Sequence, residues 1–88
     1  MPEISRFDGI SVYMYQEING PHNLPHIHAD YQGQQVVISL DGTILEGDLP
    51  SKKLRHLQVW VEMRRSELEE DWNLLAEGKR YNKIEPLR

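Results

Sequence analysis

Three of the four histidines of this chain lie within seven positions, in the stretch PHNLPHIHAD of residues 21–30. If HIHADY is a strand, His26, His28 and Asp30 point to the same side, because strand residues two apart share a face. The Cβ atoms of His26 and His28 are then about 6.5–7 Å apart, so both imidazoles can reach one zinc, iron, nickel or copper ion. The spacing therefore indicates a candidate divalent-metal site at these three residues, with His22 as a further ligand.

The same histidines are candidates for acid–base chemistry without a cofactor. A histidine that titrates near neutral pH can carry a proton to and from a ribose hydroxyl. The basic residues Lys52, Lys53 and Arg55 follow later in the chain and would bind phosphates. This pattern indicates a metal-independent ribonuclease or RNA-binding protein that uses His26 and His28.

A third interpretation gives these histidines no chemical role. His26 and His28 would then be half-exposed strand residues that hydrogen-bond to the backbone or to cross-strand neighbours. Tyr13 and Tyr15 on the preceding strand are suitable partners, because aromatic cross-strand pairs stabilise a sheet. The sequence therefore leaves open whether the protein is an enzyme.

Composition narrows the class of protein. Eighty-eight residues with 39% hydrophobic content predict one domain over residues 1–88. A formal charge of −4 gives no overall attraction to RNA, so RNA contact would need a local basic patch. The absence of cysteine excludes disulfides and zinc–thiolate sites. No apolar run resembles a signal peptide or a membrane span, so we expect a cytoplasmic protein without membrane contact.

The first half of the chain alternates apolar and polar residues as strands do. Asp41-Gly42 is a two-residue hairpin signal of the type I′ kind, which needs positive φ at both positions. These patterns predict a four-stranded antiparallel meander within residues 9–48, with strands at 9–16, 26–31, 35–40 and 43–48.

The second half changes to a helical period over residues 51–78, with Ser51 or Asp48 as the expected N-cap and Gly78 as the end. The SELE capping-box pattern favours a break near Arg65. In the tail of residues 79–88, Ile84 and Leu87 would dock on the body. The predicted class is α+β, with one or two C-terminal helices packed on one face of the sheet.

One helical layer leaves the other sheet face open. We expect that face, or a strand edge, to be covered by a partner or by self-association. Trp60 lies at the edge of the apolar helical stripe. It is therefore either a partly exposed interface residue, where tryptophan is enriched, or part of a wide buried face.

Four motifs together resemble a known family: Pro-His-x-His at 25–28, Gly-Asp-Leu-Pro at 47–50, Glu-Leu…Trp at 67–72 and Ile-Glu-Pro-Leu at 84–87. The chain is similar over nearly its whole length to the small prokaryotic family called domain of unknown function 4160. The loop insert EINGPHNL departs from the family pattern, so the resemblance does not extend to His22.

The resemblance implies a partner more firmly than a reaction. No activity is established for the family, and its genes often lie beside those of domain of unknown function 2442. This layout suggests toxin–antitoxin pairs. Our leading hypothesis is therefore a small cytoplasmic module of a toxin–antitoxin-like pair that acts by protein–protein interaction, with a 2442-type protein as the expected partner. The ribonuclease or RNA binder and the metal-binding protein are the alternatives.

Overall fold

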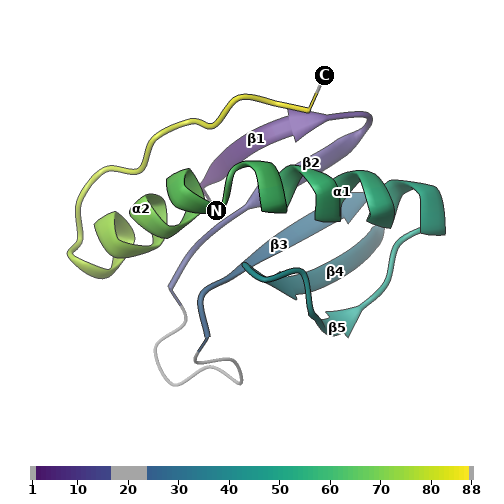
Figure 1. Cartoon of the computed structure of the whole chain (residues 1–88), viewed down its shortest axis with the longest axis horizontal. Helices are drawn as coiled ribbons and strands as arrows, with labels where there is room; N and C mark the ends of the chain where they lie inside the picture. The colour runs from purple at the N-terminus through teal and green to yellow at the C-terminus, as the bar shows by residue number, and fades with distance from the viewer. Residues whose placement is uncertain (1, 17–23, 88) are drawn as a thin grey trace.

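The computed structural model describes residues 2–16 and 24–87, which form an antiparallel sheet followed by two helices (Figure 1). The strands pair in chain order as a meander. The elements are β1 Glu3–Phe7, β2 Ile10–Tyr13, β3 His26–Tyr31, β4 Gln34–Ser39, β5 Ile44–Gly47, α1 Ser51–Met63 and α2 Arg65–Ala76. The α+β class and the meander are confirmed, but the sheet has five strands instead of four. None of the described helices is long and apolar enough to cross a membrane.

The strand that the sequence analysis missed is β1, which pairs with β2 across a two-residue turn. Asp8 and Gly9 both have positive φ, 52° and 77°, as a type I′ turn requires. Gln32 and Gly33 form the β3–β4 turn and also have positive φ, 48° and 84°. The Asp-Gly signal was therefore present before β2 but was recognised only at residues 41–42.

The turn at Asp41-Gly42 has a different construction from the predicted one. Gly42 has a φ of 91°, but Asp41 is not among the residues with positive φ. Instead the Asp41 carboxylate accepts hydrogen bonds from the Ser39 hydroxyl and from the Thr43 backbone N–H at 3.0 Å. These bonds stabilise the charged form and lower the pKa of Asp41 to about 2.

Both helices lie in one layer in front of the sheet (Figure 1). Their buried side chains are chiefly Leu57, Trp60, Val61 and Leu68, which pack on the alternate strand residues that face the core. Burial of this apolar surface is the main force that holds the two layers together. The other face of the sheet is turned away from α1.

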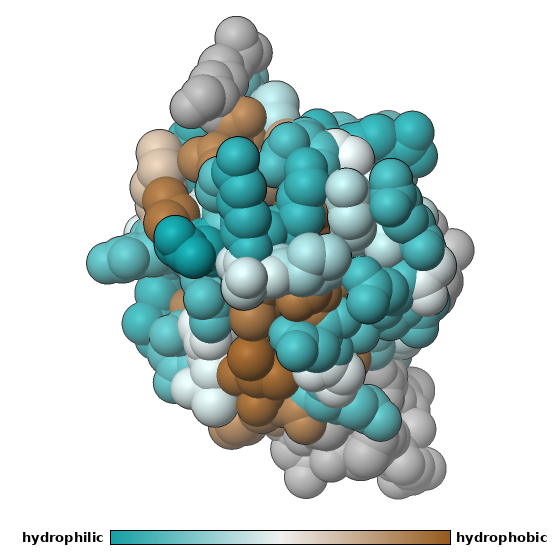
Figure 2. Space-filling model, turned by 90° about the vertical axis from the view of Figure 1, so that its right-hand side faces the viewer, coloured by the Kyte–Doolittle hydropathy of each residue, from teal (hydrophilic) through white to brown (hydrophobic). Residues whose placement is uncertain are grey.

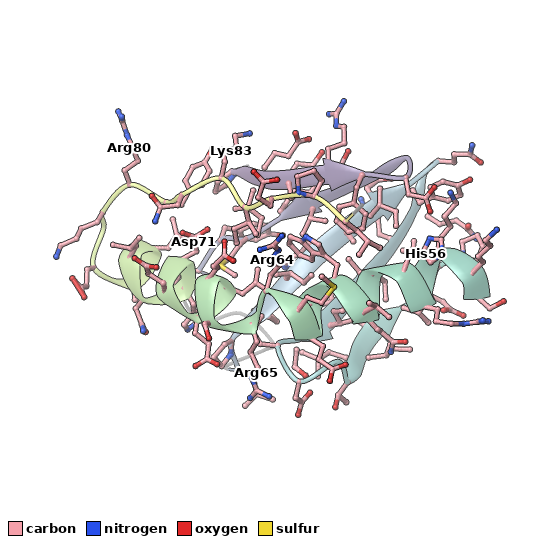
Figure 3. All side chains as sticks on the ribbon, turned by 45° about the horizontal axis from the view of Figure 1, so that its top comes forward. His56, Arg64, Arg65, Asp71, Arg80 and Lys83 are labelled. Carbon is pink, nitrogen blue, oxygen red and sulfur yellow. The ribbon has the colours of Figure 1, made fainter. Side chains whose placement is uncertain are left out.

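The helical region breaks at Arg64, which has φ −109° and ψ 18°, so the break predicted near Arg65 is confirmed. Figure 3 shows Arg64 and Arg65 pointing to opposite sides of this junction. Neither the expected cap at the start of α1 nor the SELE capping box of α2 is formed. The N-cap residues are Pro50 and Arg64, and neither makes a side-chain capping bond. Ser51 is instead the first helical residue.

The tail after α2 runs back along the edge of β1 (Figure 1). The Ile84 N–H donates to the Ile4 carbonyl at 2.8 Å, and the Ile84 side chain is buried in the core. Leu87 packs against the same core. The predicted docking of both residues is confirmed.

Trp60 is fully buried, so its assignment as an exposed interface residue is wrong. Its ring lies 5.2 Å from that of Phe7, and its indole N–H donates to the Glu85 carbonyl at 2.7 Å. The docked tail therefore covers the tryptophan that would otherwise lie at the edge of the helical stripe.

Asp71 links α2 to the tail. Its side chain is completely buried, points toward the tail in Figure 3, and accepts a hydrogen bond from the Asn82 N–H at 2.8 Å. Its second oxygen has no hydrogen-bond partner among the described residues. Burial raises the pKa of Asp71, because the charged carboxylate loses its solvation.

Gly47→Ala is expected to destabilise the fold more than Gly42→Ala does. Both glycines have positive φ, which costs a residue with a Cβ about 1–2 kcal/mol. A Cβ on Gly47 would also collide with the Gln35 backbone carbonyl, whereas the space at Gly42 is open. We expect an extra loss of about 1–3 kcal/mol for Gly47→Ala, measured by urea unfolding. Equal losses would contradict the close approach of β5 to β4.

Asp71 and Asp41 should affect the pH dependence of stability with opposite signs. The raised pKa of Asp71 gives a contribution that is present below about pH 4 and is lost as pH rises through the folded-state pKa. The lowered pKa of Asp41 gives a contribution that is present above about pH 4 and is lost as pH falls toward 2.

Thermal unfolding of wild type, Asp71→Asn and Asp41→Asn from pH 2 to 8 tests this. Relative to Asp71→Asn, wild type should become less stable as pH rises. Relative to Asp41→Asn, it should become less stable as pH falls. Parallel profiles for all three proteins would refute both assignments.

Candidate functional site

A row of side chains crosses the face of the sheet opposite the core, which we call the open face. The strand register places Glu3 beside Tyr13, Tyr13 beside His28, His28 beside Val37, and Val37 beside Glu46. Neighbours in such a row have Cβ atoms about 4.5–5.5 Å apart. The open face therefore carries aromatic and imidazole rings at its centre and carboxylates at both ends.

A small hollow lies in this row, which we call the tyrosine hollow. It has a volume of ≈ 110 Å³.

Pockets for drug-sized ligands are larger, at roughly 300–1,000 Å³. The residues that line the tyrosine hollow come from β2, β3, β4 and the segment just after β2: Tyr13, Tyr15, His28, Ala29, Asp30, Gln35 and Val37.

One wall of the tyrosine hollow is a stacked pair of rings. The Tyr15 and His28 rings lie 4.4 Å apart with an interplanar angle of 17°, and the Tyr15 hydroxyl is 3.3 Å from His28 Nδ1. The expected pairing of a β2-side tyrosine with a histidine of β3 is therefore present. The stack holds the half-buried His28 ring in one orientation at the hollow.

His26 has a different environment from His28. It is fully buried, and its ring lies 5.2 Å from the rings of both His28 and Trp72. Its Nδ1 lies 2.6 Å from the Leu24 carbonyl oxygen. Because a carbonyl oxygen only accepts, Nδ1 must carry the proton and donate it. The sequence predicted the shared side of the two rings but not the burial of His26 under α2.

Asp30 lines the tyrosine hollow at its other end. Its carboxylate accepts a hydrogen bond from the Gly33 N–H at 3.2 Å and makes no ion pair with any described residue. Within residues 2–16 and 24–87, no three histidine or acidic side chains are placed to hold a metal ion. The candidate ligand His22 lies outside the described residues.

The basic residues predicted to bind RNA belong to α1 and thus to the helical layer. Lys53 binds the Asp8 carboxylate at 2.8 Å and lies 4.9 Å from the centre of the Tyr31 ring, while Lys52 and Arg55 are exposed. His28 faces the opposite side of the sheet. The structure therefore does not bring these cations together with His26 and His28.

An ion cluster that the sequence analysis missed joins the β1–β2 turn to α1. The Asp8 carboxylate contacts Lys53 and, at 2.7 Å, His56 Nδ1. Hydrogen bonds from these two side chains lower the pKa of Asp8. No sequence motif signals this cluster, because its members are far apart in the chain.

A larger hollow of ≈ 370 Å³ lies between the β4–β5 turn and the helices. Two of its polar residues already have partners: Gln58 donates to the Gly42 carbonyl at 3.0 Å, and Arg65 pairs with Glu69 at 3.2 Å. It contains neither an aromatic ring nor a histidine. The tyrosine hollow is therefore the stronger candidate site.

Comparison with known proteins identifies a family. The family model described as Domain of unknown function (DUF4160) matches residues 9–73. This range contains the Pro-His-x-His and Gly-Asp-Leu-Pro motifs, and the family predicted from the sequence is confirmed. No curated protein and no solved structure matches the chain.

The neutral His26 ring is expected to be the Nδ1–H tautomer, because the Leu24 carbonyl can only accept a hydrogen bond. Long-range ¹H–¹⁵N NMR at neutral pH distinguishes the two nitrogens. A protonated Nε2 with a bare Nδ1 would contradict the hydrogen bond that holds the start of β3.

Proposed function

Because the chain belongs to the family of DUF4160 domains, whose description names no activity, we propose a function from its own structure. The protein is a small interaction module that binds a partner protein through the open face. The observation that carries this proposal is the tyrosine hollow, which is lined by strand residues and Tyr15 with no helix residue over it.

The properties of the open face support a protein partner. Tyrosines that are only partly buried are enriched in protein interfaces, where they supply both apolar area and a hydroxyl. The hollow is too small for a drug-sized ligand but suits one side chain of a partner. A partly aromatic sheet face with one small hollow is thus better suited to a protein surface than to a small substrate.

The free edge of the sheet is a weaker docking surface than the open face. β5 has four residues, an irregular register opposite β4, and Pro50 soon after it. Short and bulged edges resist strand addition. Ile44 of β5 is 43% exposed, and Figure 2 shows that apolar side chains form only limited areas within a largely hydrophilic surface.

The family resemblance suggests the kind of partner. We propose that the module acts in the cytoplasm within a toxin–antitoxin-like pair, with a neighbouring-gene product of the 2442 type as its partner. Self-association through the open face is the competing assembly. Sedimentation of the module alone and of the mixture distinguishes the two by mass.

Cleavage of RNA by His26 and His28 has less support. His26 is buried beneath Trp72, and the cations of α1 lie on the other side of the sheet from His28. An RNA strand could not contact both groups at one site. Acid–base catalysis needs its groups within hydrogen-bond reach of the same substrate.

Gln35→Arg should weaken binding of the neighbouring-gene product at least tenfold. Gln35 is exposed and lines the tyrosine hollow, so a long charged side chain there would obstruct it. Gln34→Arg is the matched control, because the adjacent strand residue is also exposed but points to the other face. Isothermal titration calorimetry gives both affinities.

Unchanged affinity in Gln35→Arg would refute the open face as the interface. Equal weakening by the two variants would indicate a general effect of charge. Failure of the wild-type module to bind the neighbouring-gene product would refute the proposed pair.

A further inference from the structure

We propose that the tyrosine hollow receives an arginine side chain of the partner protein. This inference rests on the proposed function and specifies the chemistry that the open face recognises. It is drawn from three features of the hollow: its aromatic walls, its carboxylate and its size.

The aromatic walls suit a planar cation. Tyr13 and the stacked pair of Tyr15 and His28 line the hollow, and Val37 contributes an apolar surface. The face of a tyrosine ring attracts a cation, and a guanidinium can also stack flat on the ring. A cation placed here would therefore gain both electrostatic attraction and apolar contact.

The charge of the open face is complementary to a cation. Arg6 is a cation of β1, but it is paired with Glu3 at 2.8 Å. Asp30 lines the hollow without an ion pair to any described residue, and the Gly33 N–H holds its carboxylate in place. An incoming guanidinium could donate two hydrogen bonds to this carboxylate.

Size and charge distinguish arginine from the other candidates. The hollow of ≈ 110 Å³ accepts the end of one side chain. A lysine ammonium is more strongly hydrated and cannot stack as a plane. A nucleobase could stack, but its phosphates would lie near Asp30, and RNA affinity depends on cations that contact phosphates.

The test uses three peptides that differ at one residue: acetyl-Gly-Ser-Arg-Ser-Gly-amide and its citrulline and lysine counterparts. Citrulline keeps the planar shape of arginine without the charge. Each peptide is titrated into ¹⁵N-labelled wild-type protein and followed by amide NMR shifts. We expect shifts around Tyr13, His28 and Asp30 with the arginine peptide, and affinity on the order of tenfold lower with citrulline.

Two variants locate the binding site. Asp30→Asn removes the charge but keeps an oxygen that can accept the Gly33 N–H, so the turn should be retained. It should weaken the arginine peptide on the order of tenfold. Glu62→Gln removes a carboxylate from the separate hollow beside α1 and should leave affinity unchanged.

Equal affinity for arginine, citrulline and lysine peptides, or no shifts with the arginine peptide, overturns this inference. A loss in Glu62→Gln instead of Asp30→Asn also overturns it. If either result occurs while Gln35→Arg still weakens partner binding, the interaction function stands and only the arginine assignment fails. If Gln35→Arg leaves partner binding unchanged, the proposed function itself fails.

Discussion

The fold depends on the need to satisfy the indole N–H of a fully buried tryptophan. Trp60 is enclosed by the core, and its N–H bonds to the Glu85 carbonyl at 2.7 Å. A buried donor without a partner costs about 1–3 kcal/mol, so this bond fixes the position of the tail. The docked tail in turn places Ile84 in the core and its N–H on the Ile4 carbonyl.

This arrangement determines which surfaces remain for a partner. The tail lies along β1 and gives it a further hydrogen bond, while β5 forms a short, irregular edge. The helices cover the core face. Apart from the end at His26, which contacts Trp72 of α2, the open face therefore remains the broadest strand surface. The same constraint that completes the core thus leaves the opposite face as the surface for which we propose partner binding.

The sequence predicted the elements better than their packing. Alternation correctly placed four strands, because it depends on local preferences, and the helical break falls at Arg64 although the SELE capping box that suggested it is not formed. β1 was missed although Asp8-Gly9 carried the required turn signal. The burial of Trp60 could not be deduced from helical periodicity, because it depends on a tail carbonyl that is distant in sequence.

The site was predictable to the same limited extent. Strand periodicity placed His26 and His28 on one side, but the contact with Trp72 that buries His26 is a tertiary one. Their different burial has a chemical consequence. His28, Tyr13 and Asp30 share an accessible hollow without a cation from the helices, so the local charge disfavours phosphate and favours a guanidinium. The spacing of the histidines suggested a catalytic pair, whereas their surroundings support recognition of a positively charged partner.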